Sequence, residues 1–294
     1  MKATLAILLL LFAMCYQPQT TPRTLEDAYA ANSTKLLHQF YTDWNREIKP
    51  ATDSELNAMN DTLKQAYLAF TAFYKPLNIE KLGGSEWGND IYKSVDFFVV
   101  QNYVKIYFTP KLVYSAQDSD DRMVNYIKTT VKDTAFRARC LKRYNGKLSQ
   151  MVRENFWPDM KDTLADSIIN FRPQINCDGK LPLYLNSKYE DILNRFLGDD
   201  HYQLGRSGMM TPATSKGESE RRKEFLEKGI KIFYGHWGGY WQFNSYPVAG
   251  RITFDRQMRY AKVNFRMVYQ GGEAILENDN GKWKLISSRL TWIE

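Results

Sequence analysis

The last quarter of the chain, Gly229 to Glu294, has the most regular hydrophobic pattern in the sequence. Runs rich in aromatic and β-branched residues alternate there with short turns that contain Gly or Asn. Successive side chains of a strand point to opposite faces of a sheet, so a period of two predicts an antiparallel sheet with one apolar face. The clearest run places five apolar side chains on one face: Ala261, Val263, Phe265, Met267 and Tyr269.

Turn-forming residues predict where this sheet changes direction. The pair Gly271-Gly272 is expected to turn the chain between two strands. The segment from Asn278 to Gly281 is expected to form a tight hairpin, because Asn and Gly tolerate the positive φ angles of such turns. In the last strand the apolar positions change parity, which predicts a β-bulge between Ile286 and Ser288 that bends the sheet.

Upstream of this region the sequence predicts helices with a few short strands. One helix is expected to begin at Thr24 and end before Pro50, and a capping box at Thr52 to Glu55 begins a second helix that ends at Pro76. The remaining expected elements are one or two buried strands in 95–108, helices over 122–142 and 148–169, a strand over 181–185, and helices over 189–197 and 218–228. The fold class that follows is α+β, with an N-terminal helical region packed on a C-terminal curved antiparallel sheet.

The N-terminus has the features of an export signal. Lys2 is followed by an apolar run over residues 3–14, which is too short for a permanent membrane span and suits a signal peptide. The segment that ends in Cys15 resembles a bacterial lipoprotein signal, in which the Cys is lipidated, although Met14 stands where that family has a small residue. Cleavage near residues 13–17 with no lipid is the alternative. The protein is therefore expected to be exported, as a periplasmic or membrane-anchored lipoprotein or as a secreted protein.

Composition suggests how the chain is divided. We expect a signal peptide at 1–15, a leader at 16–23 and a mainly helical α+β region at 24–204. Residues 205–217 are small, polar and contain Pro and Gly, so they are expected to form a linker or mobile loop before the sheet region at 218–294. Whether these regions form one domain or two is left open.

Charge and cysteine content narrow the function classes. The formal net charge of +7 has its longest cluster at Arg137 to Arg143, which fits a solvated helix face, a phosphate-binding face or weak attraction to an anionic surface. Nucleic acid is disfavoured as a partner, since no face or tail concentrates the charge further. Cys140 and Cys177 either form one disulfide or are two buried thiols. No metal-ligand cluster and no cofactor motif is present, so neither metal nor cofactor is expected.

The end of the chain resembles the C-terminal half of NTF2-like (cystatin-like α+β, SnoaL-type) domains. The resemblance rests on Gly272, Ala274 to Leu276, Gly281 to Leu285 and Leu290 to Ile293, after a charged helix. In that superfamily the sheet wraps around helices into a cone with an internal pocket. Some members are enzymes and many are small-molecule binding or accessory domains, so the resemblance implies a cavity but no particular activity.

Two groups of residues in or just before the predicted first strand of this sheet, Tyr240 to Tyr246, are candidates for a site. His236 lies in a glycine-rich segment and is the candidate catalytic residue, with Asp255 as a carboxylate that alternation places on the polar face. The second group is aromatic and would bind a ligand or fill the core: Trp237, Tyr240, Trp241, Phe243 and Tyr246.

Three functions remain open from the sequence. The favoured one is a non-catalytic NTF2-like protein that binds a small molecule, glycan or protein partner in a cupped sheet, and that could form a homodimer. The second is a lyase, isomerase or hydrolase that uses His236 with a carboxylate. The third is a structural or assembly component of a cell envelope, which exposed apolar area on the outer face of the sheet would favour.

Overall fold

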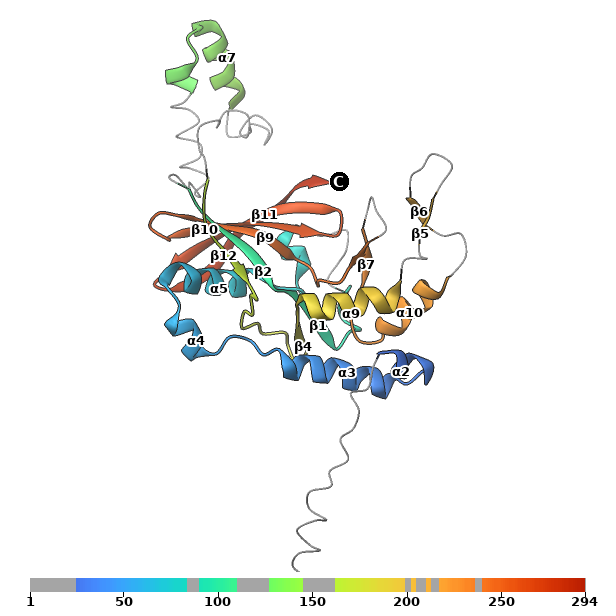
Figure 1. The fold of residues 1–294 in the computed structure, drawn as a ribbon. Coiled ribbons are helices and arrows are strands. Elements are labelled where there is room, and N and C mark those ends of the chain that lie inside the picture. Colours follow the sequence, from blue (N-terminus) through green and yellow to red (C-terminus); the bar gives the residue numbers. More distant parts are fainter. Residues whose placement is uncertain are drawn as a thin grey trace, which may run out of the picture.

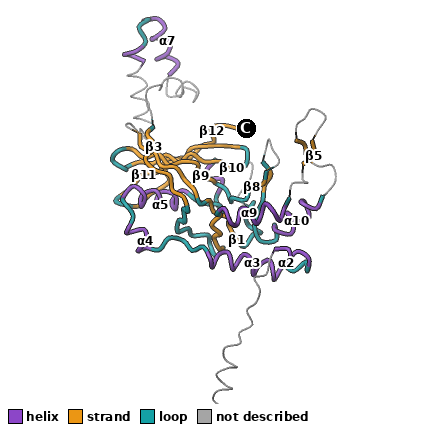
Figure 2. The backbone as a smooth tube through the Cα atoms, viewed as in Figure 1, coloured by secondary structure: helices purple, strands orange, loops and turns teal. Residues whose placement is uncertain are grey.

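The computed structural model describes residues 25–83, 90–109, 127–144, 162–198, 202–204, 210–212, 217–235 and 240–293. The predicted signal peptide and leader, His236, Trp237 and most of the predicted 205–217 linker lie outside these residues. The described architecture is α+β, as the sequence predicts (Figure 1). One large sheet is covered by helices on one side, and a second group of helices surrounds a two-stranded sheet (Figure 2).

The large sheet has six strands in the order β12-β11-β10-β9-β2-β3. Strands β9 to β12 form an antiparallel meander, β2 runs parallel to β9, and β3 pairs antiparallel with β2 at the far edge. The prediction of a wholly antiparallel C-terminal sheet is therefore wrong, because the sheet is mixed and chain segments from both sides of the predicted 205–217 linker contribute to it. The strand bounds are β2 Tyr103–Thr109, β3 Thr163–Ile169, β9 Val248–Asp255, β10 Tyr260–Met267, β11 Gln270–Asp279 and β12 Lys282–Ile293.

Three local predictions for the meander are confirmed. Every second residue of β10 from Ala261 to Met267 is buried. The hairpin between β11 and β12 has Asn280 and Gly281 at φ angles of 52° and 85°, as a tight turn of the Asn-Gly kind requires. On β12, Ser287 pairs with Ile275 and Leu285 with Leu276, so Ile286 is the extra residue of a bulge.

The prediction of a turn at Gly271-Gly272 is wrong. Both glycines lie inside β11, and the chain turns three residues earlier, at Val268 and Tyr269. The glycines instead allow neighbouring groups to approach the strand closely. A Cβ on Gly272 would lie 2.6 Å from Cζ of Phe265 and would collide with the Arg289 carbonyl oxygen. A Cβ on Gly271 would enter the indole ring of Trp292.

The prediction of a helix over 148–169 is also wrong where it can be compared. Residues 148–161 lie outside the described part, but Thr163–Ile169 is strand β3. Its backbone pairs with β2, for example Ile168 with Val104 and Ile169 with Tyr103. The neighbouring strand supplies hydrogen-bond partners that the local sequence does not reveal, so tertiary context decides this segment.

The N-terminal helices follow their capping residues. The single helix predicted to end before Pro50 is two helices, α2 Leu25–Ala30 and α3 Thr34–Glu47. Asn32 takes φ 42°, and the Ser33 side chain accepts a hydrogen bond from Leu36 N to start α3. The predicted capping box is confirmed at the start of α4 Asp53–Ala58. Asn60 then caps α5 Asp61–Phe73.

The capping box gives a testable pH dependence. Thr52 N donates to Glu55 at 2.6 Å and Arg172 donates at 2.9 Å, and these bonds, with one to the Thr52 side chain, lower the pKa of Glu55 from its usual 4.5 to about 2. Because the pKa of Glu55 is lower in the folded state, the ionised carboxylate stabilises the fold above pH 4.5. This stabilisation is lost as the pH falls toward 2. We expect Arg172→Gln to raise the Glu55 pKa, as measured by NMR titration. An unchanged pKa would contradict the role given to Arg172.

Two hydrophobic cores lie on opposite faces of the small parallel sheet formed by β1 Phe97–Gln101 and β4 Leu181–Leu185. Phe98 and Val100 of β1 belong to the core between α5 and the large sheet, whereas Phe97 and Val99 belong to the other. All five residues of β1 are buried, because each face of the strand is covered. The second core is enclosed by α2, α3, α9 Ser187–Leu197 and α10 Glu218–Leu226.

The remaining described elements are short or peripheral. They are the 3-10 helix η1 Ile79–Leu82, α7 Thr134–Tyr144, and the paired strands β5 Tyr202–Leu204 with β6 Met210–Pro212 and β7 Phe233–Tyr234 with β8 Trp241–Gln242. Cys140 on α7 and Cys177 in the first core are both free thiols, so the disulfide, one of the two alternatives for this pair, is not formed. Burial raises the pKa of Cys177 to about 12, which fits an inert thiol.

Candidate functional site

The aromatic group proposed from the sequence is divided between the two cores. Trp241 is 8% exposed and, with Phe243, belongs to the helical core, whereas Tyr246 belongs to the core under the large sheet. Trp241 Nε1 donates to the Gly198 carbonyl at 2.9 Å. Tyr240 is 49% exposed. The described members of the group therefore share no common surface, and burial favours the packing alternative for three of them.

The proposed catalytic pair is not brought together in the described residues. His236 lies outside them. Asp255 is nearly buried at the end of β9, where its Oδ1 accepts hydrogen bonds from Arg259 N at 2.8 Å and Tyr260 N at 3.1 Å. These bonds hold the turn between β9 and β10. Within the described ranges, no group of three or more His, Cys, Asp or Glu could hold a metal ion.

The apolar face of the large sheet is filled by α5. Phe70 and Phe73 of this helix are fully buried, and the Phe73 ring lies 5.4 Å from that of Phe265 on β10. Trp283 of β12 donates to Gln65 of α5 at 2.8 Å. The predicted cup therefore holds a packed helix over the strands that the structure describes.

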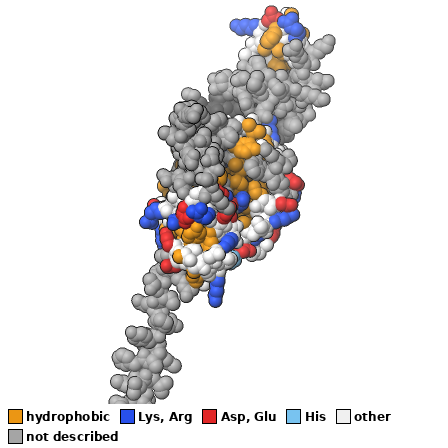
Figure 3. Space-filling model, turned by 90° about the vertical axis from the view of Figure 1, so that its right-hand side faces the viewer, with side chains coloured by type: hydrophobic (Ala, Val, Ile, Leu, Met, Phe, Trp, Pro, Cys, Tyr) orange, Lys and Arg blue, Asp and Glu red, His pale blue; other side chains and the backbone are white. Residues whose placement is uncertain are grey.

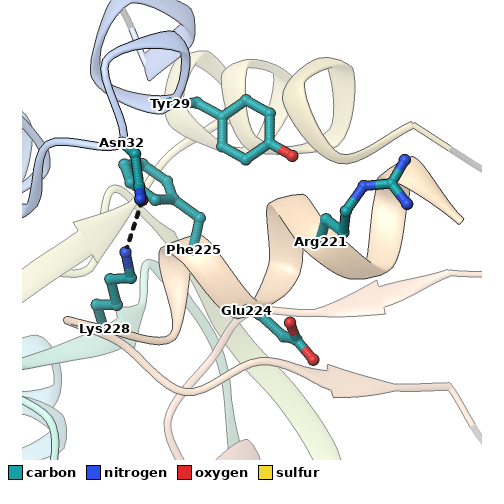
Figure 4. Close-up of a pocket in the computed structure, with 6 residues that line it drawn as sticks. All are labelled: Tyr29, Asn32, Arg221, Glu224, Phe225 and Lys228. Carbon is teal, nitrogen blue, oxygen red and sulfur yellow. Dashed lines mark hydrogen bonds between the residues drawn. The ribbon is translucent and has the colours of Figure 1, made fainter. Parts of the chain in front are cut away.

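A pocket of about 370 Å³ lies elsewhere, between α10 and the end of α2 (Figure 4). One wall comes from α10 and the turn that follows it. The other wall comes from α2 and from the break between α2 and α3. Its lining residues are Tyr29, Asn32, Arg221, Glu224, Phe225 and Lys228.

The α10 wall follows from helix geometry. Residues 221, 224, 225 and 228 are spaced at i, i+3, i+4 and i+7, which places them on one face of a helix and its continuation. The opposite wall depends on Asn32, whose φ of 42° is a conformation that Asn adopts more readily than most residues. This conformation lets its side chain reach Lys228, 196 positions later in the sequence.

Most cations around α10 are already paired with carboxylates. Glu218 binds Arg221 at 2.7 Å and Arg222 at 3.1 Å. Glu227 binds Lys223 at 2.7 Å and Lys231 at 2.8 Å, and these bonds help to lower its pKa against the opposing effect of burial. On the face of the molecule in Figure 3, Lys or Arg and Asp or Glu side chains lie next to one another around patches of hydrophobic side chains.

Lys228 differs from these neighbours. Its Nζ donates to Asn32 Oδ1 at 3.1 Å and lies 4.8 Å from the centre of the Phe225 ring. Among the described residues, no carboxylate forms an ion pair with this ammonium group. A lysine ammonium has three N–H donors, so a neutral oxygen and a ring face leave both charge and donors for a ligand.

Tyr29 adds a neutral hydroxyl to the pocket. Burial and the neighbouring Glu218 raise the pKa of Tyr29 above its usual 10.0, so its phenol keeps its proton at neutral pH. The edge of its ring packs against Phe225 and Phe196. Arg222 lies over the ring face at 5.5 Å. The pocket therefore offers the N–H donors and the positive charge of Lys228, in a lining that also contains the carboxylate of Glu224.

The sequence alone missed this site. It predicts the charged helix over 218–228, and the spacing of Arg221 and Lys228 on that helix is visible in it. Nothing local to Tyr29 or Asn32 indicates that they face α10, because that contact depends on both helices packing against the same core.

Comparison with known proteins identifies no relative. No family model, no curated protein and no solved structure matches this chain. In the described part of the chain, no helix has both the length and the apolar character required to cross a membrane.

Proposed function

We propose that this is an exported, non-catalytic binding protein of NTF2-like type whose ligand carries an anionic group, such as a carboxylate or phosphate. The ligand occupies the pocket between α2 and α10, not the inside of the sheet. The observation that carries the proposal is Lys228, a pocket cation whose partners are a neutral amide oxygen and an aromatic ring.

The size and composition of the pocket support a small ligand. A volume of about 370 Å³ falls within the range of small-molecule sites. Phe225 and Tyr29 supply apolar surface, and Asn32 supplies a polar group beside the cation. Hydrogen bonds that involve an ionised group are about twice as strong as neutral ones, so an anion gains most from Lys228.

An enzyme remains the weaker alternative. Its candidate residue His236 lies outside the described residues, and the carboxylate of Asp255 already accepts two backbone hydrogen bonds in a turn. Neither fact supports a general acid–base pair.

A role in assembly is the second candidate, and exposed apolar side chains on the large sheet favour it. Tyr103 pairs with Ile169 on the face opposite the buried Val104, and both are exposed, as is Leu164 on the same edge strand. Trp292 lies over Gly271 at the other edge. Sedimentation velocity of the full chain tests this candidate. Self-association that is abolished by Ile169→Asp would support it. A protein that stays monomeric would oppose a homodimer.

The pocket is tested by Lys228→Gln. Isothermal titration calorimetry of the full chain with succinate and with inorganic phosphate should detect binding, and the uncharged diamide of succinate should bind far more weakly. Loss of a hydrogen bond to a charged group costs about 1.5–3 kcal/mol, so the substitution should weaken binding roughly 10-fold or more.

Lys64→Gln is the matched control for this substitution. Lys64 also donates to an asparagine, Asn57 Oδ1, at 2.8 Å, but it lies outside the pocket. The control should bind the probes as the parent protein does. Absence of binding to either anion, or an equal loss in both variants, would refute the proposed site.

A further inference from the structure

Helix α7 has a composition that neither the pocket nor the cores explain. Its sequence, TAFRARCLKRY over Thr134–Tyr144, has four basic residues and no acid. The preceding residues add Lys128 and Lys132 against one acid, Asp133. Asp133 also begins the helix, because its Oδ1 accepts a hydrogen bond from Phe136 N at 2.6 Å.

The described side chains of α7 pack in neither core. None of residues 134–141, whose side chains the structure describes, belongs to either hydrophobic core, and Phe136 is 48% exposed. Figure 1 shows α7 and the short turn before it standing away from the sheet and from the other helices. Arg137 donates to the Lys128 carbonyl at 3.3 Å, which ties the helix to that turn.

Residue spacing gives α7 an apolar stripe bordered by cations. Positions 136 and 140 (Phe and Cys) are four residues apart and align along one side of the helix. Position 139, an Arg, lies next to this stripe, and the sequence has a second Arg four residues later, at position 143. Arg139 lies 5.9 Å from the Phe136 ring centre, so a cation and the exposed ring are presented together.

This arrangement suits the surface of an anionic membrane. A helix with an apolar stripe and Lys or Arg beside it can lie in the interface, its apolar side chains below the headgroups and its cations among them. Each basic residue near such a surface adds to binding. Nucleic acid would use the cations but not the exposed Phe136 stripe, so lipid accounts for both features.

We propose that α7 is a membrane-contact helix that binds anionic lipid headgroups. This contact is distinct from the α2–α10 pocket and does not depend on the function proposed for it. It also differs from a lipid anchor at Cys15, because it requires negatively charged lipid and is weakened by salt.

The test is co-sedimentation of the full chain with vesicles, in a Cys15→Ser background that prevents lipidation. Vesicles of phosphatidylcholine alone are compared with equimolar phosphatidylcholine and phosphatidylglycerol. The readout is the ratio of the two affinities, because the apolar residues 3–14 can bind either lipid. We expect at least a tenfold preference for the anionic vesicles, reduced by salt.

Charge reversal locates the contact. Arg139→Glu with Arg143→Glu should remove the preference, and Phe136→Ser should weaken binding to the anionic vesicles several-fold. Lys35→Glu with Lys105→Glu makes the same change in net charge on exposed residues elsewhere and should keep the preference. Thermal unfolding should be the same for the α7 variants as for the parent protein, since the described side chains of α7 pack in neither core. It should also be the same for the Lys35→Glu, Lys105→Glu control, since both lysines are exposed.

Three results would overturn the proposal. The first is equal affinity for neutral and anionic vesicles. The second is an unchanged preference in the Arg139→Glu, Arg143→Glu variant. The third is a parent protein that binds a double-stranded oligonucleotide but not vesicles, together with an Arg139→Glu, Arg143→Glu variant that has lost the oligonucleotide binding. This result would assign the basic helix to nucleic acid.

Discussion

Replacement of Gly272 by alanine is expected to lower the free energy of unfolding by about 2–3 kcal/mol, the upper part of the range for overpacked cores. The added methyl group would lie 2.6 Å from Cζ of Phe265 and would collide with the carbonyl oxygen of Arg289. The Phe265 ring is buried against Phe73, and the carbonyl belongs to the paired strand β12. Neither can move without loss of packing or of strand pairing. Urea unfolding followed by circular dichroism measures the change.

Gly271→Ala is the control for this prediction. The three atoms nearest to its methyl group would all belong to the side chain of Trp292, which is 47% exposed and can rotate into solvent. We expect a stability loss below about 1 kcal/mol, with a shift in tryptophan fluorescence as the ring moves. If both alanine variants lost the same stability, the distinction between a fixed backbone and a movable ring would be wrong.

Trp241→Ala is expected to cost about 3 kcal/mol or more of stability, as other buried Trp to Ala changes do. The ring lies in the helical core, 4.9 Å from that of Tyr234, and its Nε1 donates to Gly198 beyond the end of α9. The loss therefore combines a cavity with an unpaired carbonyl. Chemical denaturation of the full chain measures it.

Tyr240→Ala provides the comparison, because this neighbour is about half exposed and lies outside both cores. It should change stability by less than about 1 kcal/mol. A stable Trp241→Ala protein that had lost binding of a glycan or other ligand would instead favour the binding role that the sequence suggested. Destabilisation of Trp241→Ala alone would support packing.

The fold was predictable where the deciding interactions are local. The alternation of β10 and the Asn280-Gly281 turn each depend on a few adjacent residues, and so does the capping box at Thr52. The bulge at Ile286 was also visible as a change of parity within one strand. Predictions failed where a distant partner decides, as in β3, whose strand conformation depends on β2.

The candidate site shows the same division. The sequence correctly placed a charged helix at the residues of α10, but its aromatic candidates Trp241, Phe243 and Tyr246 are buried in the two cores. Aromatic residues near glycines look similar in sequence whether they pack or bind. In the sequence, Lys228 is one of many charged residues. It differs from the neighbouring cations because they are paired with carboxylates, and this pairing is visible only in the structure.

The sequence by itself determined the α+β class, the apolar face of the meander and the starts of α2, α4 and α10, because hydrophobic periodicity and capping act within a few residues. Only the tertiary structure decided that 163–169 is a strand, that Gly272 serves packing, and that Asn32 and Lys228 meet across 196 positions. Such contacts form when separate elements bury their apolar faces together, and a local sequence pattern does not indicate which faces will pack against each other.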